Sequence, residues 1–230
     1  MIDSVLSLVA PHICVGCGTV GKLLCSRCFF EKKKKKWLKC IVCNQQITTA
    51  VFAKNGNSCP DCIQNLPFDK VFVVGERSGA LQKLVGDYKY FSQRGGSRQI
   101  AALLSRVLPE NMSDDFVIVP LSTIPKHIRQ RGFDHMKLVA KCLAKIRRLK
   151  THNILKRTNN LSQHGASERQ RLQNAESAFV VDSKTTIPGK ILLIDDIYTT
   201  GAITQTSAKL LKSRGVDEVW LAVVARQLGD

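Results

Sequence analysis

An apolar run that leads directly into two adjacent aspartates constrains the fold of this chain more than any other feature. Residues 191–194 read Ile-Leu-Leu-Ile after a Pro-Gly turn pair. This pattern is typical of a strand buried on both faces of a parallel sheet. Asp195 and Asp196 follow, then a polar loop with one glycine, and then apolar residues at helical spacing up to Gly215. Strand, acidic pair, loop and helix together predict a ligand site at the carboxyl end of an open α/β sheet.

The residue types of the loop predict the binding of a phosphorylated sugar. Thr199, Thr200, Gly201 and Thr204 offer hydroxyl and backbone N–H groups at a helix N-terminus, where the helix dipole favours an anion such as phosphate. The glycine lets the backbone approach that anion closely. The two preceding carboxylates can accept hydrogen bonds from neighbouring sugar hydroxyls or hold a hydrated Mg²⁺. The alternative is a buried strand and a capped helix without a ligand. The lysine of a Walker motif is absent.

Eight of the nine cysteines form four Cys-x-x-Cys pairs within residues 14–62. The pairs are Cys14/Cys17, Cys25/Cys28, Cys40/Cys43 and Cys59/Cys62. Eight thiolates at this spacing predict two structural Cys₄ zinc sites, whereas a redox Cys-x-x-Cys is normally single. The spacing leaves open whether neighbouring pairs share one metal or the pairs interleave. The remaining Cys142 is expected in the core, on a helix whose apolar stripe comprises Leu138, Val139, Cys142, Leu143 and Ile146.

The chain is strongly basic, with a net charge of +17 and a pI near 9.7. Such a field favours polyanions, meaning nucleic acid, nucleotides or an anionic membrane surface, and a site for a pyrophosphorylated sugar accounts for part of it. A run of lysines, Lys32, Lys33, Lys34, Lys35 and Lys36, is followed by Trp37. The lysines can grip a phosphate backbone while the tryptophan stacks on a base. The alternative is a solvated surface.

No targeting signal is apparent at the N-terminus. Residues 2–10 are mildly apolar but short and acidic, and they fit neither a signal peptide nor a membrane span. Without a secretory signal the thiols are expected to be reduced, and the protein is expected in the cytoplasm.

Two polar stretches are predicted to surround the ligand. The loop 121–133 carries Arg129 and Arg131, whose guanidinium groups can fork onto phosphate oxygens, although a solvated basic loop has the same composition. Residues 156–174 lack a strong apolar period. A polar stretch of this length in a compact domain is usually a functional lid or a disordered loop.

The segment 191–204 resembles the phosphoribosyl pyrophosphate (PRPP) loop of type I phosphoribosyltransferases, and looks most like the version in ComF-type competence proteins. The resemblance extends over nearly the whole chain, including the cysteine pairs. It implies that Asp195 and Asp196 hold the ribose hydroxyls and are the catalytic residues. The residues it assigns to PRPP are Asp195, Asp196, Thr199, Thr200, Gly201, Ala202, Thr204, Arg129 and Arg131.

The polar stretch is similar to the segment that covers the PRPP site of ComF-type proteins as a flexible hood. The matching residues are Gln163, Ser167, Arg171 and Asn174. Four positions depart from the family pattern: Asp134 and His135 stand where asparagine and glutamine are usual, Ser122 stands where a proline-like stretch often begins, and Ala166 replaces a leucine. The first three departures affect the fine geometry of the basic loop, but not its location.

We therefore predict an α/β fold: a Rossmann-like type I phosphoribosyltransferase domain with a parallel sheet over residues 68–230, and an N-terminal Cys₄-type zinc module over residues 1–67. The resemblance implies a competence factor for natural transformation that handles internalised single-stranded DNA and binds PRPP with Mg²⁺. The family also suggests a DNA-uptake helicase or other competence proteins as partners. The alternative is an active phosphoribosyltransferase that transfers phosphoribose to an unidentified acceptor. DNA binding is favoured because no hood residue can be assigned to reading an acceptor base.

Overall fold

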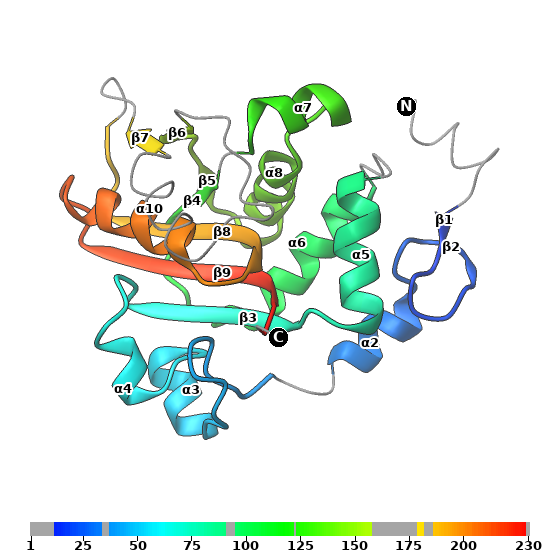
Figure 1. Cartoon of the computed structure of the whole chain (residues 1–230), viewed down its shortest axis with the longest axis horizontal. Coiled ribbons are helices and arrows are strands. Elements are labelled where there is room, and N and C mark those ends of the chain that lie inside the picture. The colour runs from blue at the N-terminus through cyan, green and yellow to red at the C-terminus, as the bar shows by residue number, and fades with distance from the viewer. Residues whose placement is uncertain are drawn as a thin grey trace.

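A sheet of five parallel strands forms the centre of the protein (Figure 1). The computed structural model describes residues 12–33, 37–90, 95–121, 123–157, 179–181 and 186–228. In spatial order the strands are β3 (Lys70–Glu76), β9 (Glu218–Arg226), β8 (Lys190–Tyr198), β4 (Val117–Pro120) and β5 (Lys150–Thr151). The α/β fold with a parallel sheet that the sequence predicts is confirmed.

Helices cover both faces of the sheet, which gives three layers (Figure 1). One face carries α5 (Gly79–Tyr90), α6 (Gly96–Val107) and α8 (His135–Arg147), and the other carries α10 (Ala202–Lys212). Side chains of β8 alternate between them: Leu192 and Ile194 pack with the first group, and Ile191 and Leu193 pack with α10. All four are buried, which explains the unbroken apolar run.

The acidic pair lies within β8 and not beyond its end, because the strand continues to Tyr198. This strand is longer than the sequence predicted. Its register with β9 runs on through Tyr198 opposite Arg226, whereas its register with β4 stops at Pro120 opposite Ile194. The chain leaves β4 toward α8 on one face and leaves β8 toward α10 on the other. A crevice between two such strands is the usual ligand site of an open α/β sheet.

Part of the predicted basic loop is a short helix, α7 (Pro125–Arg131). The fixed backbone of Pro125 starts the helix, and Gly132 ends it in the left-handed conformation with φ 74°. In α8 the buried residues Met136, Val139, Ala140 and Leu143 follow an i, i+3, i+4, i+7 spacing. Ile146 lies outside this stripe and is 49% exposed, so its predicted place in the core is wrong.

The cysteine-rich N-terminal part packs against the larger layer structure in two places. It comprises β1 (His12–Ile13), β2 (Val20–Gly21), α2 (Ser26–Lys33), α3 (Thr49–Asn55) and α4 (Pro60–Ile63). Leu23 and Leu24 pack with residues of α5 and α6. The buried Asn57 accepts a hydrogen bond from the Val73 N–H at 2.7 Å, which satisfies a donor of β3. The boundary at residue 67 stays a prediction. Within the described residues, no helix is long and apolar enough to cross a membrane.

Candidate functional site

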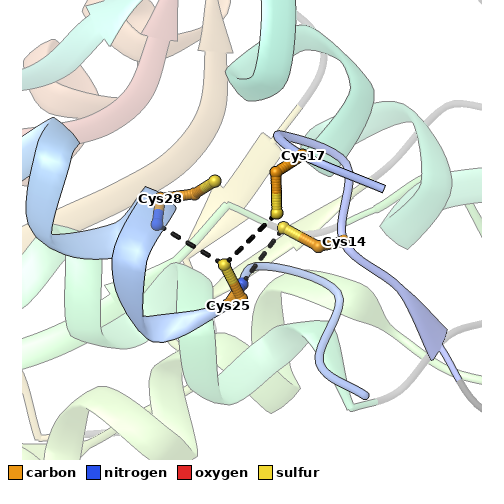
Figure 2. A group of neighbouring side chains, drawn as sticks. All are labelled: Cys14, Cys17, Cys25 and Cys28. Atoms are coloured by element: carbon orange, nitrogen blue, oxygen red, sulfur yellow. Dashed lines mark hydrogen bonds between the residues drawn. The ribbon is translucent and has the colours of Figure 1, made fainter. Parts of the chain in front are cut away.

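The eight paired cysteines gather into two groups of four. Cys14, Cys17, Cys25 and Cys28 form the first group, and Cys40, Cys43, Cys59 and Cys62 form the second. Within each group the sulfur atoms all lie within 4.8 Å of one another, so that each group could hold a metal ion. Figure 2 shows the four side chains of the first group converging. Neighbouring pairs therefore share a site, which answers the question that the spacing left open.

The thiol chemistry of both groups fits a tetrahedral zinc site. Hydrogen bonding with Thr19 lowers the pKa of Cys17 to about 6. Burial raises the pKa of Cys40, but surrounding backbone N–H groups bring it down to about 7. In the first group, burial and then the neighbouring cysteines raise the pKa of Cys28 to about 12. Thiolates are the form that binds zinc, and a bound cation would relieve the crowding of negative charge.

The two aspartates of β8 point to opposite faces of the sheet, because successive side chains of a strand alternate. Asp196 is buried on the α5 and α8 side. Its Oδ2 atom lies 2.8 Å from Nζ of Lys89 and 2.5 Å from Nε2 of His135. Burial alone would raise the pKa of Asp196, but Lys89 and then His135 lower it below its ordinary value. The carboxylate is therefore held in its ionised form.

His135 connects this carboxylate to the segment that follows β4. Its Nδ1 atom lies 2.9 Å from Oγ1 of Thr123 and 3.3 Å from Nη1 of Arg131. Since an arginine can only donate, we assign Nδ1 as the acceptor and Nε2 as the nitrogen that donates to Asp196. The backbone of His135 is fixed as well, because its carbonyl accepts a hydrogen bond from the Tyr88 hydroxyl at 2.7 Å.

Asp195 faces the α10 side and has a different environment. Burial, and then the charge of Asp196, raise its pKa to about 7, while Lys89 and Arg157 act in the opposite direction. Arg157 comes from the hairpin of β6 (Leu155–Arg157) and β7 (Phe179–Val181) and lies over the Phe179 ring. Its Nε atom is buried and has no hydrogen-bond partner among the described residues. A positive group is thus held beside a carboxyl that can change its protonation near neutral pH.

A cavity of about 180 Å³ lies where these side chains meet. Its lining comprises Lys89, Leu121, Thr123, Ile124, His127, Arg131, His135, Arg157, Asp195, Asp196 and Ile203. The edge of the sheet is therefore open, and basic side chains surround the two acidic ones. Ligand pockets for drug-sized molecules are typically about 300–1,000 Å³. A ligand of the size of PRPP would extend beyond this cavity.

The loop between β8 and α10 is held in shape by its own residues. Gly201 adopts the left-handed conformation with φ 78°, and an added Cβ would lie 2.1 Å from the Tyr198 hydroxyl. Thr204 is buried and its hydroxyl donates to the Gly201 carbonyl at 2.9 Å, whereas Thr199 is exposed. The glycine is therefore required by the backbone conformation and by the packing of Tyr198, independently of any phosphate.

The structure brings together only some of the predicted residues. Arg131 lines the cavity, but Arg129 is exposed on α7 and does not. Trp37 is partly buried against the core that contains Ile41. The backbone of Lys32 and Lys33 lies in α2. Outside the described residues lie Lys34, Lys35, Lys36, Gln163, Ser167, Arg171 and Asn174.

Several cavity residues were not assigned to the site from the sequence: Lys89, Thr123, His127, His135 and Arg157. A lysine-tyrosine pair at 89–90 resembles the family pattern and was the one signal that could have found the first of them. Thr123 and His127 lie in the predicted basic loop 121–133, His135 follows it closely, and Arg157 lies in the polar stretch 156–174, but no pattern singled out these four residues within those segments.

Comparison with known proteins finds relatives that are named as competence proteins. No family model matches it. It is 29% identical over 213 residues to competence protein F of Haemophilus influenzae, covering 88% of this chain and 90% of that protein. It is 31% identical over 140 residues to competence protein ComFC of Streptococcus pneumoniae, covering 61% of this chain and 60% of that protein. This chain is a homologue of the ComF-type competence proteins.

Among solved structures, this chain is similar to a hypoxanthine phosphoribosyltransferase from Staphylococcus aureus. The TM-score is 0.37 at 16% sequence identity, and the match covers 62% of this chain and 76% of the other.

Proposed function

We propose that this ComF-type protein binds PRPP at the carboxyl edge of β8 and handles single-stranded DNA in the cytoplasm during natural transformation. One observation carries the PRPP part: a cavity that contains both aspartates and several cationic side chains opens beside a preformed glycine loop at a helix N-terminus. Carboxylates suit sugar hydroxyls, and the loop and the cations suit phosphate groups. The names of the relatives support the role in competence.

Each part of the site has a proposed role. Asp195 and Asp196 bind the ribose hydroxyls, and residues 199–202 with Thr204 bind the 5-phosphate. Arg131 and Arg129 bind the pyrophosphate, with Arg131 already at the cavity. The carboxylate oxygens also fit Mg²⁺, whose remaining ligands would be oxygens of water and PRPP. Mg²⁺ would offset the charge of the pyrophosphate, while the protein groups orient the sugar.

Calorimetry with Mg²⁺ and PRPP tests the assignment. We expect Asp195→Asn to weaken PRPP binding at least about tenfold, because the neutral amide loses a charged hydrogen bond to the ribose and a ligand for Mg²⁺. Asp115→Asn is the matched control, since Asp115 is an exposed carboxylate that pairs with Lys190 at the other end of β8. Equal PRPP affinity of the wild type and Asp195→Asn would contradict the site.

The DNA part of the proposal is supported by the net charge of +17 and by the five consecutive lysines before Trp37. Replacing Lys32, Lys33, Lys34, Lys35 and Lys36 by glutamine should weaken single-stranded DNA binding and reduce its dependence on salt concentration, because fewer counterions are released. The matched control replaces five scattered exposed lysines: Lys22, Lys54, Lys83, Lys141 and Lys145. Equal salt slopes for the two variants would place the DNA surface elsewhere.

A second candidate function is transfer of phosphoribose from PRPP to an acceptor. It is favoured by the pKa of Asp195, which burial raises to about 7 and which suits a group that exchanges a proton near neutral pH. Incubation with Mg²⁺, PRPP and a panel of bases or single-stranded DNA separates the two functions. Pyrophosphate release that requires both an acceptor and Asp195 supports the enzyme, and its absence with intact PRPP binding supports the binding protein.

A further inference from the structure

Arg226, the last residue of β9, joins the loop after β8 to the second cysteine group (Cys40, Cys43, Cys59 and Cys62). Its Nη1 atom donates to the Thr199 carbonyl at 2.7 Å. Its Nε atom donates to the Ile41 carbonyl at 2.6 Å. Ile41 directly follows Cys40 in the turn that brings the pair Cys40 and Cys43 together. One guanidinium group therefore binds the backbone of both segments.

Both ends of this connection are firmly placed. The Ile41 N–H donates to the Asn57 carbonyl at 2.8 Å, and Ile41 is completely buried. At the other end, the Arg226 guanidinium lies 5.4 Å from the centre of the Tyr198 ring. That ring is 2% exposed and packs against the position where Gly201 would carry a side chain. A displacement of the turn at Cys40 and Cys43 would therefore be passed to the loop 199–201 through the contacts of Arg226 and Tyr198.

The electrostatics of Arg226 also point to the cysteine group. Burial lowers the pKa of Arg226, while Tyr198 and Cys40 act in the opposite direction. A divalent metal bound by four thiolates leaves net negative charge on the site, which a neighbouring guanidinium can offset. The first cysteine group has a different environment: Cys14 and Cys28 pack with residues of α5 and α6.

We propose that Arg226 is a positioning residue through which a metal ion in the second cysteine group keeps the loop 199–201 in its phosphate-binding shape. The first cysteine group has no such role. The inference rests on the proposed function in one respect, that a phosphate is the group this loop binds. It adds that the two metal sites of the chain differ in function.

The first test compares Arg226→Met with Arg77→Met by calorimetry, using ribose 5-phosphate and inorganic pyrophosphate as probes. We expect Arg226→Met to weaken ribose 5-phosphate binding about tenfold, with pyrophosphate affinity nearly unchanged, because Arg131 lies outside the connection. Arg77 is the matched control, since its side chain donates a hydrogen bond to the side chain of Gln227, the residue that follows Arg226. A general loss of structure would weaken both probes equally and would overturn the assignment of a specific role.

The second test addresses the metal with Cys43→Ser and Cys17→Ser, which each remove one ligand from one group. Metal content per chain is measured together with ribose 5-phosphate affinity. We expect the first variant to lose both metal and affinity, and the second to lose metal alone. If Cys43→Ser does not fold, the wild type is used instead: its zinc is removed by chelation and added back stepwise. We then expect the affinity for ribose 5-phosphate to recover as the second cysteine group fills. Equal affinities for the two variants would overturn the inference.

Hydrogen exchange separates this inference from the proposed function. If the wild type binds neither ribose 5-phosphate nor PRPP, the proposed function fails while the connection can still be tested. We then expect amides of residues 199–202 in the ligand-free protein to exchange at least about tenfold faster in Arg226→Met, with amides of β4 unchanged. Unchanged exchange at residues 199–202 would show that Arg226 does not hold the loop.

Discussion

Nε2 of His135 lies 2.5 Å from Oδ2 of Asp196, although the two residues are 61 positions apart in the chain. The histidine is the first residue of α8, and the aspartate lies near the end of β8. This contact sets the orientation of one acidic side chain at the cavity, and it is made by a residue that stands where ComF-type proteins usually have glutamine.

We expect His135→Leu to lower the free energy of unfolding by about 1–3 kcal/mol, because it leaves a buried carboxylate without one of its hydrogen-bond donors. His135→Gln is the matched variant, since its amide can donate to the same oxygen, and it should retain most of the stability. Urea unfolding of both variants measures the difference. Equal losses for leucine and glutamine would mean that the contact contributes packing and not hydrogen bonding.

The raised pKa of Asp195 predicts how its contribution to stability depends on pH. The group has an ordinary pKa of 3.8 and one of about 7 in the folded protein, so the folded state keeps a proton that the unfolded chain loses between these values. Stability should therefore fall as pH rises through this window and level off above about 7. The pKa of Asp196 is lowered from its ordinary value of 3.8, so this group changes the stability only below pH 3.8 and does not affect the window above it.

The measurement compares the unfolding free energies of the wild type and Asp195→Asn from pH 5 to pH 8. Other titrating groups cancel in the difference. We expect the wild type to lose stability relative to the variant by up to about 1.4 kcal/mol per pH unit below pH 7. A difference that is constant across this range would show that Asp195 keeps its ordinary pKa.

Gly201 allows a test of the loop that separates backbone strain from packing. Gly201→Ala places a methyl group 2.1 Å from the Tyr198 hydroxyl and also requires a positive φ, so we expect a loss of at least about 2 kcal/mol. Gly215→Ala is the matched control, because Gly215 has φ 87° but its added Cβ would meet nothing within 4 Å. Thermal unfolding of both variants measures the packing contribution, and equal losses would contradict the close approach of Tyr198.

We expect two zinc ions per chain, one for each group of four cysteines, because each set of sulfur atoms is already close enough to share one ion. Native mass spectrometry before and after chelation measures the stoichiometry. Cys142→Ser is the control, since Cys142 lies on α8 near Ser97 and away from both groups, and it should leave the metal content unchanged. A chain without metal after expression in zinc-supplemented medium would revive a redox role for the cysteine pairs.

Much of the site could be predicted from the sequence because its parts are local. The apolar run, the acidic pair and the glycine loop occupy one short stretch, so the strand, the loop and the helix after it follow from residue order alone. The cysteine pairs are local in the same sense. The length of β8 was missed because Asp195 and Asp196 interrupt its apolar run, although pairing with β9 as far as Arg226 keeps the following residues in the strand.

The amino-acid sequence by itself determined the parallel α/β sheet, the position of the acidic pair and the presence of paired thiols, since each depends on neighbouring residues. Only the tertiary structure decided which cysteine pairs share a site, and which distant residues meet the acidic pair. Lys89, His135 and Arg157 come from three separate elements, and Arg226 reaches Ile41 across 185 positions of the chain. Such contacts depend on how strands and helices pack, and no local pattern of residues encodes them.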